Sequence, residues 1–426
     1  MAIKIANTFD YRLNPIAAPT QPATIAPIRV AWLIGGEESF GAKRAISGLA
    51  GAVRPLGVEP IFLSLAAGPF AQECSAAGFA VQLLGLTQPP RLRPSALLRP
   101  FDYLRLQRYQ HQASKVILEA ARQAEARAMH VLWPDQMPLA AAAARCLAIP
   151  CFWEMPNAIS NHWLWDFNRW FYQRQTAHYG VIVLANSRYT ATTFGDRPIK
   201  PHVLYLGTDA ARFDPARVRT VARAELGIPE NAAVMGIFAR IEPGKGQDRA
   251  LAAALPLARE HNLHLLLVGA IHEDQPFIRT LQDEAAAAGL AGSLHVVDAT
   301  PEPERYYGVV DIAVNATVAA ESFGFSVVEA MMMEKPVLAH ALGGPTETVL
   351  DGITGWHVRE PTAAALQAGL IRAMGDQSRW GQMGTAGRTR ALEHFSLGRQ
   401  AQQYIQFLSQ ALAPAWPAGP ARSGHE

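Results

Sequence analysis

Short apolar runs alternate with helix-like segments along almost the whole chain. The runs are continuously apolar rather than alternating with polar residues, a pattern typical of strands buried on both faces of a sheet. Alternation of strand and helix implies parallel sheets with right-handed crossovers. The sequence therefore predicts an α/β fold of doubly wound, Rossmann-like sheets. The predicted strands are residues 28–36, 58–66, 79–86, 129–134, 149–155, 181–187, 233–240, 263–270, 294–299, 310–316 and 336–342.

The length of the chain sets the number of domains. At roughly 100–200 residues per domain, a chain of 426 residues predicts two, and a hydrophobic content of 50% lets each build its own core. A polar segment near residues 206–232 separates the two sets of strands. We expect a disordered tail over 1–27, Rossmann-like domains over 28–205 and 206–395 that face each other across a cleft, and a disordered tail over 413–426.

Charge and cysteine content narrow the class of protein. A formal net charge of +2 does not indicate a nucleic-acid partner, which would usually require a strongly basic domain. The three cysteines form no C-x-x-C pattern, as expected of a reduced, cytoplasmic chain. The first residues lack the apolar core of a secretory signal, and no run approaches the ~18 apolar residues of a membrane span.

A cationic loop follows the strand at 233–240. Arg240 ends this strand, Gly244 and Gly246 lie in the loop, and a helix is expected to begin near Gln247. Glycines let a backbone approach a ligand closely, helix N-termini favour anions, and Arg and Lys supply full positive charge. Arg240 and Lys245 therefore predict a phosphate or diphosphate clamp. A surface loop with two solvated cations is the alternative.

Two explanations fit the stretch "ESFGFSVVEAM" that begins at Glu321. Ser326 and Glu329 match the S-x-x-E capping box, in which the acid bonds back to the helix start. That explanation leaves Glu321 and the aromatic residues Phe323 and Phe325 without a role. A sugar-nucleotide site would use them all, since a carboxylate accepts strong, charge-assisted bonds from the hydroxyls of a sugar or a ribose.

A glycine turn, Gly35-Gly36, ends the first strand and should border the cleft. The stretch "IGGEESFGAKRA" is not a nucleotide-binding P-loop, because Lys43 is followed by Arg44 rather than Ser or Thr. It is not the G-x-G-x-x-G fingerprint of dinucleotide-binding proteins either.

Taken together, these motifs resemble the donor half of the retaining glycosyltransferases of family 4. The family's R-x4-K pair is matched by Arg240 and Lys245, and its E-x7-E pattern by Glu321 and Glu329. The stretches "YLGTDAARFDP" at 205–215 and "VIVLANSRYTATTF" at 181–194 resemble further family segments, and the likeness covers about residues 28–410. The resemblance implies the GT-B fold, with an acceptor-binding N-terminal domain, a donor-binding C-terminal domain, and a final helix at 396–412 that packs back on the N-terminal domain.

The resemblance also implies an activity. It is transfer of a hexose, with retention and without a metal, from a UDP- or GDP-linked sugar to a glycan, lipid-linked or small-molecule acceptor. No cofactor is expected besides this donor substrate. The implied catalytic residues are Arg240, Lys245 and Glu321. The implied donor-binding residues are these three with Phe323, Gly324, Phe325, Ser326, Val328 and Glu329.

The acceptor side departs from the family pattern. Many members carry a histidine after the strand that corresponds to residues 149–155, and this chain has none there. We expect Glu154 or Asn157 to contact the acceptor in its place. Gly35 and Gly36 are expected on the acceptor side or at the cleft as well. The alternative is that Glu154 and Asn157 are ordinary turn residues at the end of a strand. The basic, aromatic stretches 91–110 and 161–175 predict a peripheral contact with the inner face of a membrane, or else amphipathic helices with solvated arginines.

Two other functions compete with transfer. An NAD(P)-dependent oxidoreductase also uses doubly wound sheets, but the missing G-x-G-x-x-G argues against it. A non-catalytic nucleotide-sugar-binding protein would carry the same donor residues and differ on the acceptor side.

Overall fold

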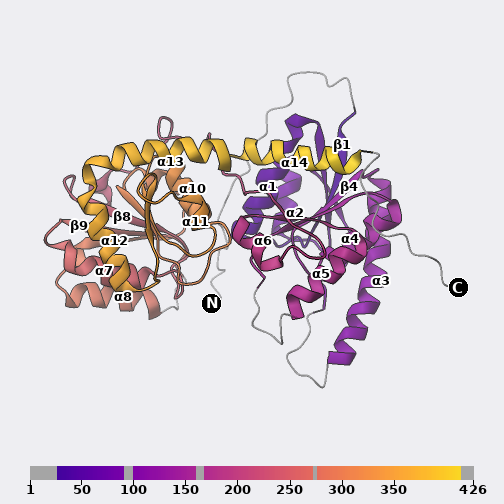
Figure 1. Cartoon of the computed structure of the whole chain (residues 1–426), viewed down its shortest axis with the longest axis horizontal. Helices are drawn as coiled ribbons and strands as arrows, with labels where there is room; N and C mark the ends of the chain where they lie inside the picture. Colours follow the sequence, from indigo (N-terminus) through magenta and orange to yellow (C-terminus); the bar gives the residue numbers. More distant parts are fainter. Residues whose placement is uncertain (1–25, 91–98, 160–166, 272–275, 414–426) are drawn as a thin grey trace, which may run out of the picture. The chain divides into compact units, whose positions relative to one another are not determined.

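The computed structural model describes residues 26–90, 99–159, 167–271 and 276–413 (Figure 1). The described residues divide into two compact units. The N-terminal unit comprises residues 26–207 with 400–413, and the C-terminal unit comprises residues 208–399. The predicted tails fall almost entirely outside the described residues, as do parts of the two basic, aromatic stretches.

The described part of the N-terminal unit is built on one seven-stranded sheet in the order β3-β2-β1-β4-β5-β6-β7, with all neighbours parallel. Helices cover both faces of this sheet. The strands are β1 (Ile28–Ile34), β2 (Val58–Ser64), β3 (Ala80–Leu83), β4 (Ala128–Val131), β5 (Cys151–Met155), β6 (Ile182–Ala185) and β7 (His202–Val203). The helices are α1 (Phe40–Val53), α2 (Pro69–Ala76), α3 (Arg99–Gln123), α4 (Met137–Leu147), α5 (Phe167–Tyr179), α6 (Arg188–Phe194) and α14 (Leu397–Leu412).

Side chains alternate between two cores along these strands. In β1, Leu33 joins the core that contains the buried face of α4, whereas Trp32 joins the core that contains α1. The second core also takes Tyr404 and Leu408 of α14 (Figure 1). The last of the described helices therefore completes the hydrophobic core of the first unit.

The described part of the C-terminal unit has a six-stranded parallel sheet in the order β10-β9-β8-β11-β12-β13. Its strands are β8 (Ala233–Phe238), β9 (Leu263–Val268), β10 (Leu294–Val297), β11 (Ile312–Asn315), β12 (Val337–His340) and β13 (Gly355–Val358). Its helices are α7 (Gln247–Ala258), α8 (Pro276–Ala287), α9 (Glu304–Tyr307), α10 (Phe325–Met332), α11 (Pro345–Thr348), α12 (Ala363–Gly375) and α13 (Trp380–Phe395).

The predicted fold class, two doubly wound parallel sheets, is confirmed. All eleven predicted strands are present, and the two that were not predicted, β7 and β13, each lie at one edge of a sheet. In each sheet the strand order reverses once, between β1 and β4 and between β8 and β11. Ligands of open α/β sheets bind beyond the carboxyl ends of the strands at such a switch point.

Candidate functional site

The switch point of the C-terminal unit brings two loops into backbone contact. The loop after β8 and the loop after β11 are joined by a hydrogen bond of 3.1 Å from Val318 N to Gly244 O. A Cβ atom on Gly246 would lie 1.9 Å from the carbonyl oxygen of Ala316, and Gly246 has a φ of +79°. Only glycine fits both the close approach and this backbone conformation. The two loops are therefore held together as one surface.

Arg240 and Lys245 both lie on the first of these loops. The Arg240 side chain is 42% exposed, and its guanidinium lies 3.0 Å from a carboxylate oxygen of Glu242. Gln247, at the start of α7, donates a hydrogen bond of 2.8 Å from Nε2 to the Arg240 carbonyl. Lys245 is half-buried. The loop thus offers two cations at the carboxyl edge of the sheet, close to the start of a helix.

Glu321 lies on the second loop and is fixed through both its backbone and its side chain. Asn315, the last residue of β11, donates a hydrogen bond of 2.6 Å to Glu321 Oε2. The Gly344 amide donates a bond of 2.7 Å to the Glu321 carbonyl. A Cβ atom on Gly344 would lie 2.6 Å from the Cα atom of Phe323, so the loop after β12 packs directly on this segment. Loops from three strands that are neighbours in the sheet, β8, β11 and β12, therefore meet at the segment that carries Glu321.

The capping-box interpretation of Ser326 and Glu329 is wrong, because α10 does not begin at Ser326. Gly324, with a φ of +92°, is the residue before the helix, and no side chain caps it. Ser326 lies inside the first turn, so its hydroxyl cannot act as the cap. A Cβ atom on Gly324 would lie 3.6 Å from Glu321 Oε2, which places the helix start beside the Glu321 carboxylate.

The aromatic and aliphatic residues around Gly324 differ in exposure. Phe323 is buried, with its ring packed on Phe325 and Phe395. Val328 is fully buried in the domain core. Phe325 and Ser326 are half-buried. The structure therefore brings these residues to one helix start, with Val328 facing the interior.

Glu329 lies one turn into α10 and is 3% exposed. Its Oε2 accepts a hydrogen bond of 2.8 Å from the Tyr307 hydroxyl. The Tyr307 ring in turn stacks on Phe238 with 3.6 Å between ring centroids. Tyr307 was not predicted from the sequence, because the pair is formed between α9 and α10 across 22 positions.

His340, the last residue of β12, contacts the loop after β11. Its Nδ1 lies 3.1 Å from the Thr317 carbonyl, which can only accept, so the ring donates. Nε2 has no hydrogen-bond partner among the described residues. Burial is the largest influence on this imidazole and lowers its pKa. A neutral imidazole therefore tethers the loop that leads to Glu321.

The residues predicted for the acceptor side lie in different surroundings in the N-terminal unit. Gly35 and Gly36 follow β1 at the switch point, as expected, and Asn157 is exposed after β5. Glu154 is fully buried inside β5, and one of its carboxylate oxygens lies 3.1 Å from His130 Nε2. The structure therefore gives no support to an acceptor contact by Glu154, which pairs with a core histidine instead.

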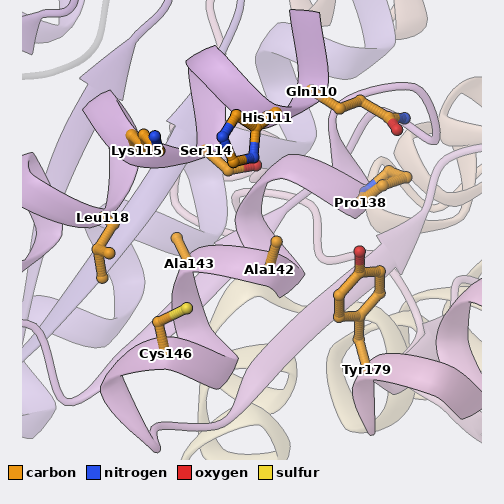
Figure 2. Close-up of a pocket in the computed structure, with 10 residues that line it drawn as sticks. All are labelled: Gln110, His111, Ser114, Lys115, Leu118, Pro138, Ala142, Ala143, Cys146 and Tyr179. Carbon is orange, nitrogen blue, oxygen red and sulfur yellow. The ribbon is translucent and has the colours of Figure 1, made fainter. Parts of the chain in front are cut away.

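A separate groove of about 440 Å³ lies between α3, α4 and the end of α5 (Figure 2). Figure 2 shows polar side chains of α3 along one wall and Cys146 of α4 on the other. None of the predicted donor or acceptor residues lines it. The lining residues are Gln110, His111, Ser114, Lys115, Leu118, Pro138, Ala142, Ala143, Cys146 and Tyr179.

Two doubly wound domains, one with cations and acids gathered at its switch point, define a protein of the GT-B class. Residues 218–390, which lie within the C-terminal unit, match the family model Glycosyl transferases group 1, so this part of the chain is similar to that family.

Among curated relatives, a D-inositol 3-phosphate glycosyltransferase of Nocardia farcinica is 33% identical over 231 residues, which are 51% of this chain and 48% of the relative. A GDP-mannose-dependent alpha-(1-6)-phosphatidylinositol monomannoside mannosyltransferase of Mycolicibacterium smegmatis is 31% identical over 245 residues, 54% of this chain and 62% of the relative. The chain thus spans only about half to three-fifths of these relatives.

Solved structures share the fold along most of the chain. A glycosyltransferase from Rickettsia africae superposes with a TM-score of 0.76 at 20% identity, over 91% of this chain and 100% of that one. HepE from Anabaena, solved with UDP and glucose, superposes with a TM-score of 0.70 at 20% identity, over 90% of this chain and 99% of that one. At this identity the likeness establishes the GT-B fold.

Proposed function

We propose that this chain is a glycosyltransferase that moves a hexose from a nucleoside diphosphate sugar to a hydroxyl group of an acceptor, with retention of configuration. The convergence of three loops at the switch point of the C-terminal unit carries this proposal. It gathers Arg240, Lys245 and Glu321 on one edge of the sheet, with Glu329 one helical turn away.

The charges at this edge suit a sugar nucleotide. Two cations on a glycine-containing loop at a helix start can bind a diphosphate, and the carboxylate of Glu321 can accept hydrogen bonds from sugar hydroxyls. Glu329, whose carboxylate is oriented by the Tyr307 hydroxyl, would accept hydrogen bonds from the hydroxyls of the ribose. The amides at Gly324 and Phe325, which open α10, would face the diphosphate.

The transfer step follows from these groups. As the bond between the sugar and the diphosphate breaks, negative charge develops on the leaving phosphate. Arg240 and Lys245 stabilise that charge, which is the main electrostatic contribution of the protein to the rate. The acceptor hydroxyl then attacks the sugar from the face that the phosphate leaves and gives its proton to the departing phosphate, so the configuration is retained and no protein nucleophile is required. The cationic loop performs the role that a metal ion has in other transferases.

The relatives guide the choice of substrates. One named relative depends on GDP-mannose and acts on a phosphatidylinositol monomannoside, and HepE has been solved with UDP and glucose. We therefore propose UDP- or GDP-linked hexoses as donors and a glycan, lipid-linked or small-molecule acceptor.

A peripheral contact with a membrane remains part of this proposal. On α5, Trp170 is 52% exposed and the Arg174 guanidinium lies 5.7 Å from its ring centre, as suits an interfacial side chain. No helix among the described residues has the length and apolarity needed to cross a bilayer.

Thermal-shift titration with UDP, GDP, ADP and their hexose conjugates tests the donor site directly. One nucleotide should raise the melting temperature by mass action. A coupled assay of nucleotide release should then lose about 100-fold or more in rate in Lys245→Ala, as when one transition-state donor is removed.

Glu329→Gln should weaken nucleotide binding while leaving the fold intact. Arg279→Ala and Glu284→Gln are matched controls on the exposed surface of α8. Full transfer activity in both site variants would refute the proposed site, and stabilisation by NAD(P) alone would refute the activity.

A further inference from the structure

The main chain at Glu321 is held on both sides by the loop after β12. The Glu321 amide donates a hydrogen bond of 3.2 Å to the Leu342 carbonyl, and the Glu321 carbonyl accepts one of 2.7 Å from the Gly344 amide. These two bonds form a parallel bridge between Glu321 and Gly343. They fix the backbone, but the rotatable bonds of a glutamate side chain still let its carboxylate point in several directions. A further contact is needed to fix the carboxylate itself.

Asn315 supplies that contact from a central strand of the sheet. It is the last residue of β11, pairs in register with Ala339 of β12, and is 6% exposed. Its Nδ2 donates a hydrogen bond of 2.6 Å to Glu321 Oε2. A carboxylate can only accept, so the nitrogen of the amide rather than its oxygen faces Glu321. Since hydrogen bonds to an ionised group are the strong kind, the Glu321 carboxylate is tied firmly to the strand.

The two oxygens of the Glu321 carboxylate are not equivalent. Oε2 accepts the bond from Asn315 and would lie 3.6 Å from a Cβ atom on Gly324, at the start of α10. Oε1 has no hydrogen-bond partner among the residues that the structure describes, and it is not one of their enclosed, unpaired polar atoms. Oε1 is therefore the oxygen that remains accessible to a hydroxyl group of a ligand.

A neutral amide suits this position better than other side chains of similar reach. A lysine or an arginine would pair with the charge of Glu321, and an aspartate would repel it. An apolar side chain would leave Oε2 without its donor. Asn315 holds one oxygen in place without adding a charge, so hydrogen bonds from ligand hydroxyls to Oε1 are still made to an ionised group.

We propose that Asn315 is a positioning residue that determines which hydroxyl of the donor hexose Glu321 recognises. This inference rests on the proposed function. With Oε2 held by Asn315, Oε1 meets a hydroxyl of one configuration, and a hexose with the opposite configuration at that carbon cannot form the same bond. A site built to bond a hydroxyl discriminates strongly, because the wrong substrate leaves it unpaired. Asn315 acts through Glu321 and not through the cations of the loop after β8.

Pairs of sugar nucleotides that differ at one carbon test this inference without an acceptor. Calorimetric titration of the full chain compares UDP-glucose with UDP-galactose, and GDP-mannose with GDP-glucose. The wild-type chain should bind one member of a pair about tenfold or more tightly than the other. Asn315→Leu removes the donor at similar size. It should weaken binding of the preferred member by about tenfold or more, as expected from loss of a hydrogen bond to a charged group, and make the two affinities similar.

The affinity for UDP and GDP separates positioning from a structural role. These probes lack the hexose, so in Asn315→Leu their affinity should stay within about twofold of the wild-type value, whereas a disturbed sheet would weaken them as well. Asn231→Leu is the matched control, because it removes an exposed amide from the turn before β8. This control should keep every affinity of the wild-type chain.

Asn315→Asp keeps the shape of the side chain and places a second carboxyl group against Glu321. The contact can then persist only while a proton lies between the two groups, because two adjacent carboxylates repel each other. The affinity of this variant for the preferred sugar nucleotide, relative to that of the wild type, should therefore fall as the pH rises. Its affinity for UDP or GDP should follow that of the wild type at every pH.

Four results would each overturn the role of Asn315. They are equal binding of both members of each pair by the wild type, an unchanged ratio in Asn315→Leu, an equal loss of UDP or GDP affinity in that variant, and a wild-type pH dependence in Asn315→Asp. Any of them in a chain that binds UDP or GDP refutes this inference alone. A chain that binds neither nucleotide refutes the proposed function instead.

Discussion

The hydroxyl of Tyr307 offers the sharpest test of how the donor site is built. Tyr307→Phe removes only this oxygen, because a phenyl ring keeps the stacking on Phe238. The hydroxyl lies 2.8 Å from Glu329 Oε2 and 3.2 Å from the Ser326 carbonyl. Since it carries one proton, it donates fully to one of them, and the shorter contact to the carboxylate is favoured.

The expected magnitude follows from the burial of this pair. A hydrogen bond to a charged group contributes about 1.5–3 kcal/mol, and Glu329 is 3% exposed, so water cannot replace the lost donor. For a domain of this size each kcal/mol shifts the melting temperature by about 2–4 °C. If Glu329 also holds the ribose, losing its orientation should weaken nucleotide binding by about tenfold, equivalent to about 1.4 kcal/mol.

Urea unfolding measures the change in stability, and nucleotide titration measures the change in affinity, in Tyr307→Phe and in a control variant. Tyr306→Phe is the matched control, since it deletes a hydroxyl one position away on α9. Unchanged stability and unchanged nucleotide affinity in Tyr307→Phe would refute the role given to this bond. Equal losses in Tyr306→Phe would show that the effect is not specific to the pair with Glu329.

Three further predictions follow from the same structure. Gly246→Ala should lower both the melting temperature and nucleotide affinity, because its Cβ would lie 1.9 Å from the Ala316 carbonyl oxygen; wild-type values in a thermal-shift titration would contradict the loop packing. Tyr404→Phe should leave the melting temperature unchanged or raise it, since that fully buried hydroxyl has no partner among the described residues. Burial lowers the pKa of His264 and of His295, so the unfolded chain binds more protons near pH 6 and stability should fall as the pH drops below about 6.5. In the double variant His264→Gln and His295→Gln, urea unfolding at several pH values should show a smaller loss of stability as the pH drops. An unchanged dependence of stability on pH would exclude this pair as its source.

The sequence sufficed for the features that depend on local patterns. Continuous apolar runs identified every central strand because each is buried on both faces. The edge strands β7 and β13 lacked this signal, since β7 has only two residues and Gly355 and His357 interrupt the apolar residues of β13. The positions of Arg240 and Glu321 followed from the strand ends that precede them.

Contacts between distant residues were beyond prediction from the sequence. Ser326 and Glu329 matched a capping box, but the helix begins after Gly324, which has a φ of +92°, on a loop against which Gly344 packs. Glu154 was expected either as an acceptor contact or as a turn residue at the end of a strand, but it lies buried inside β5. Its partner His130 is 24 positions away, and no local pattern signals such a pair.

The membership of α14 in the N-terminal unit has a consequence for biosynthesis. Gly207, at the end of the first stretch of that unit, donates a hydrogen bond to Gln400, which lies 193 positions later. A nascent chain therefore leaves the apolar surface around Trp32 and Phe152 uncovered while the whole C-terminal unit is still being translated. Only when α14 leaves the ribosome can the first unit close, so the half that is synthesised first is the half that matures last.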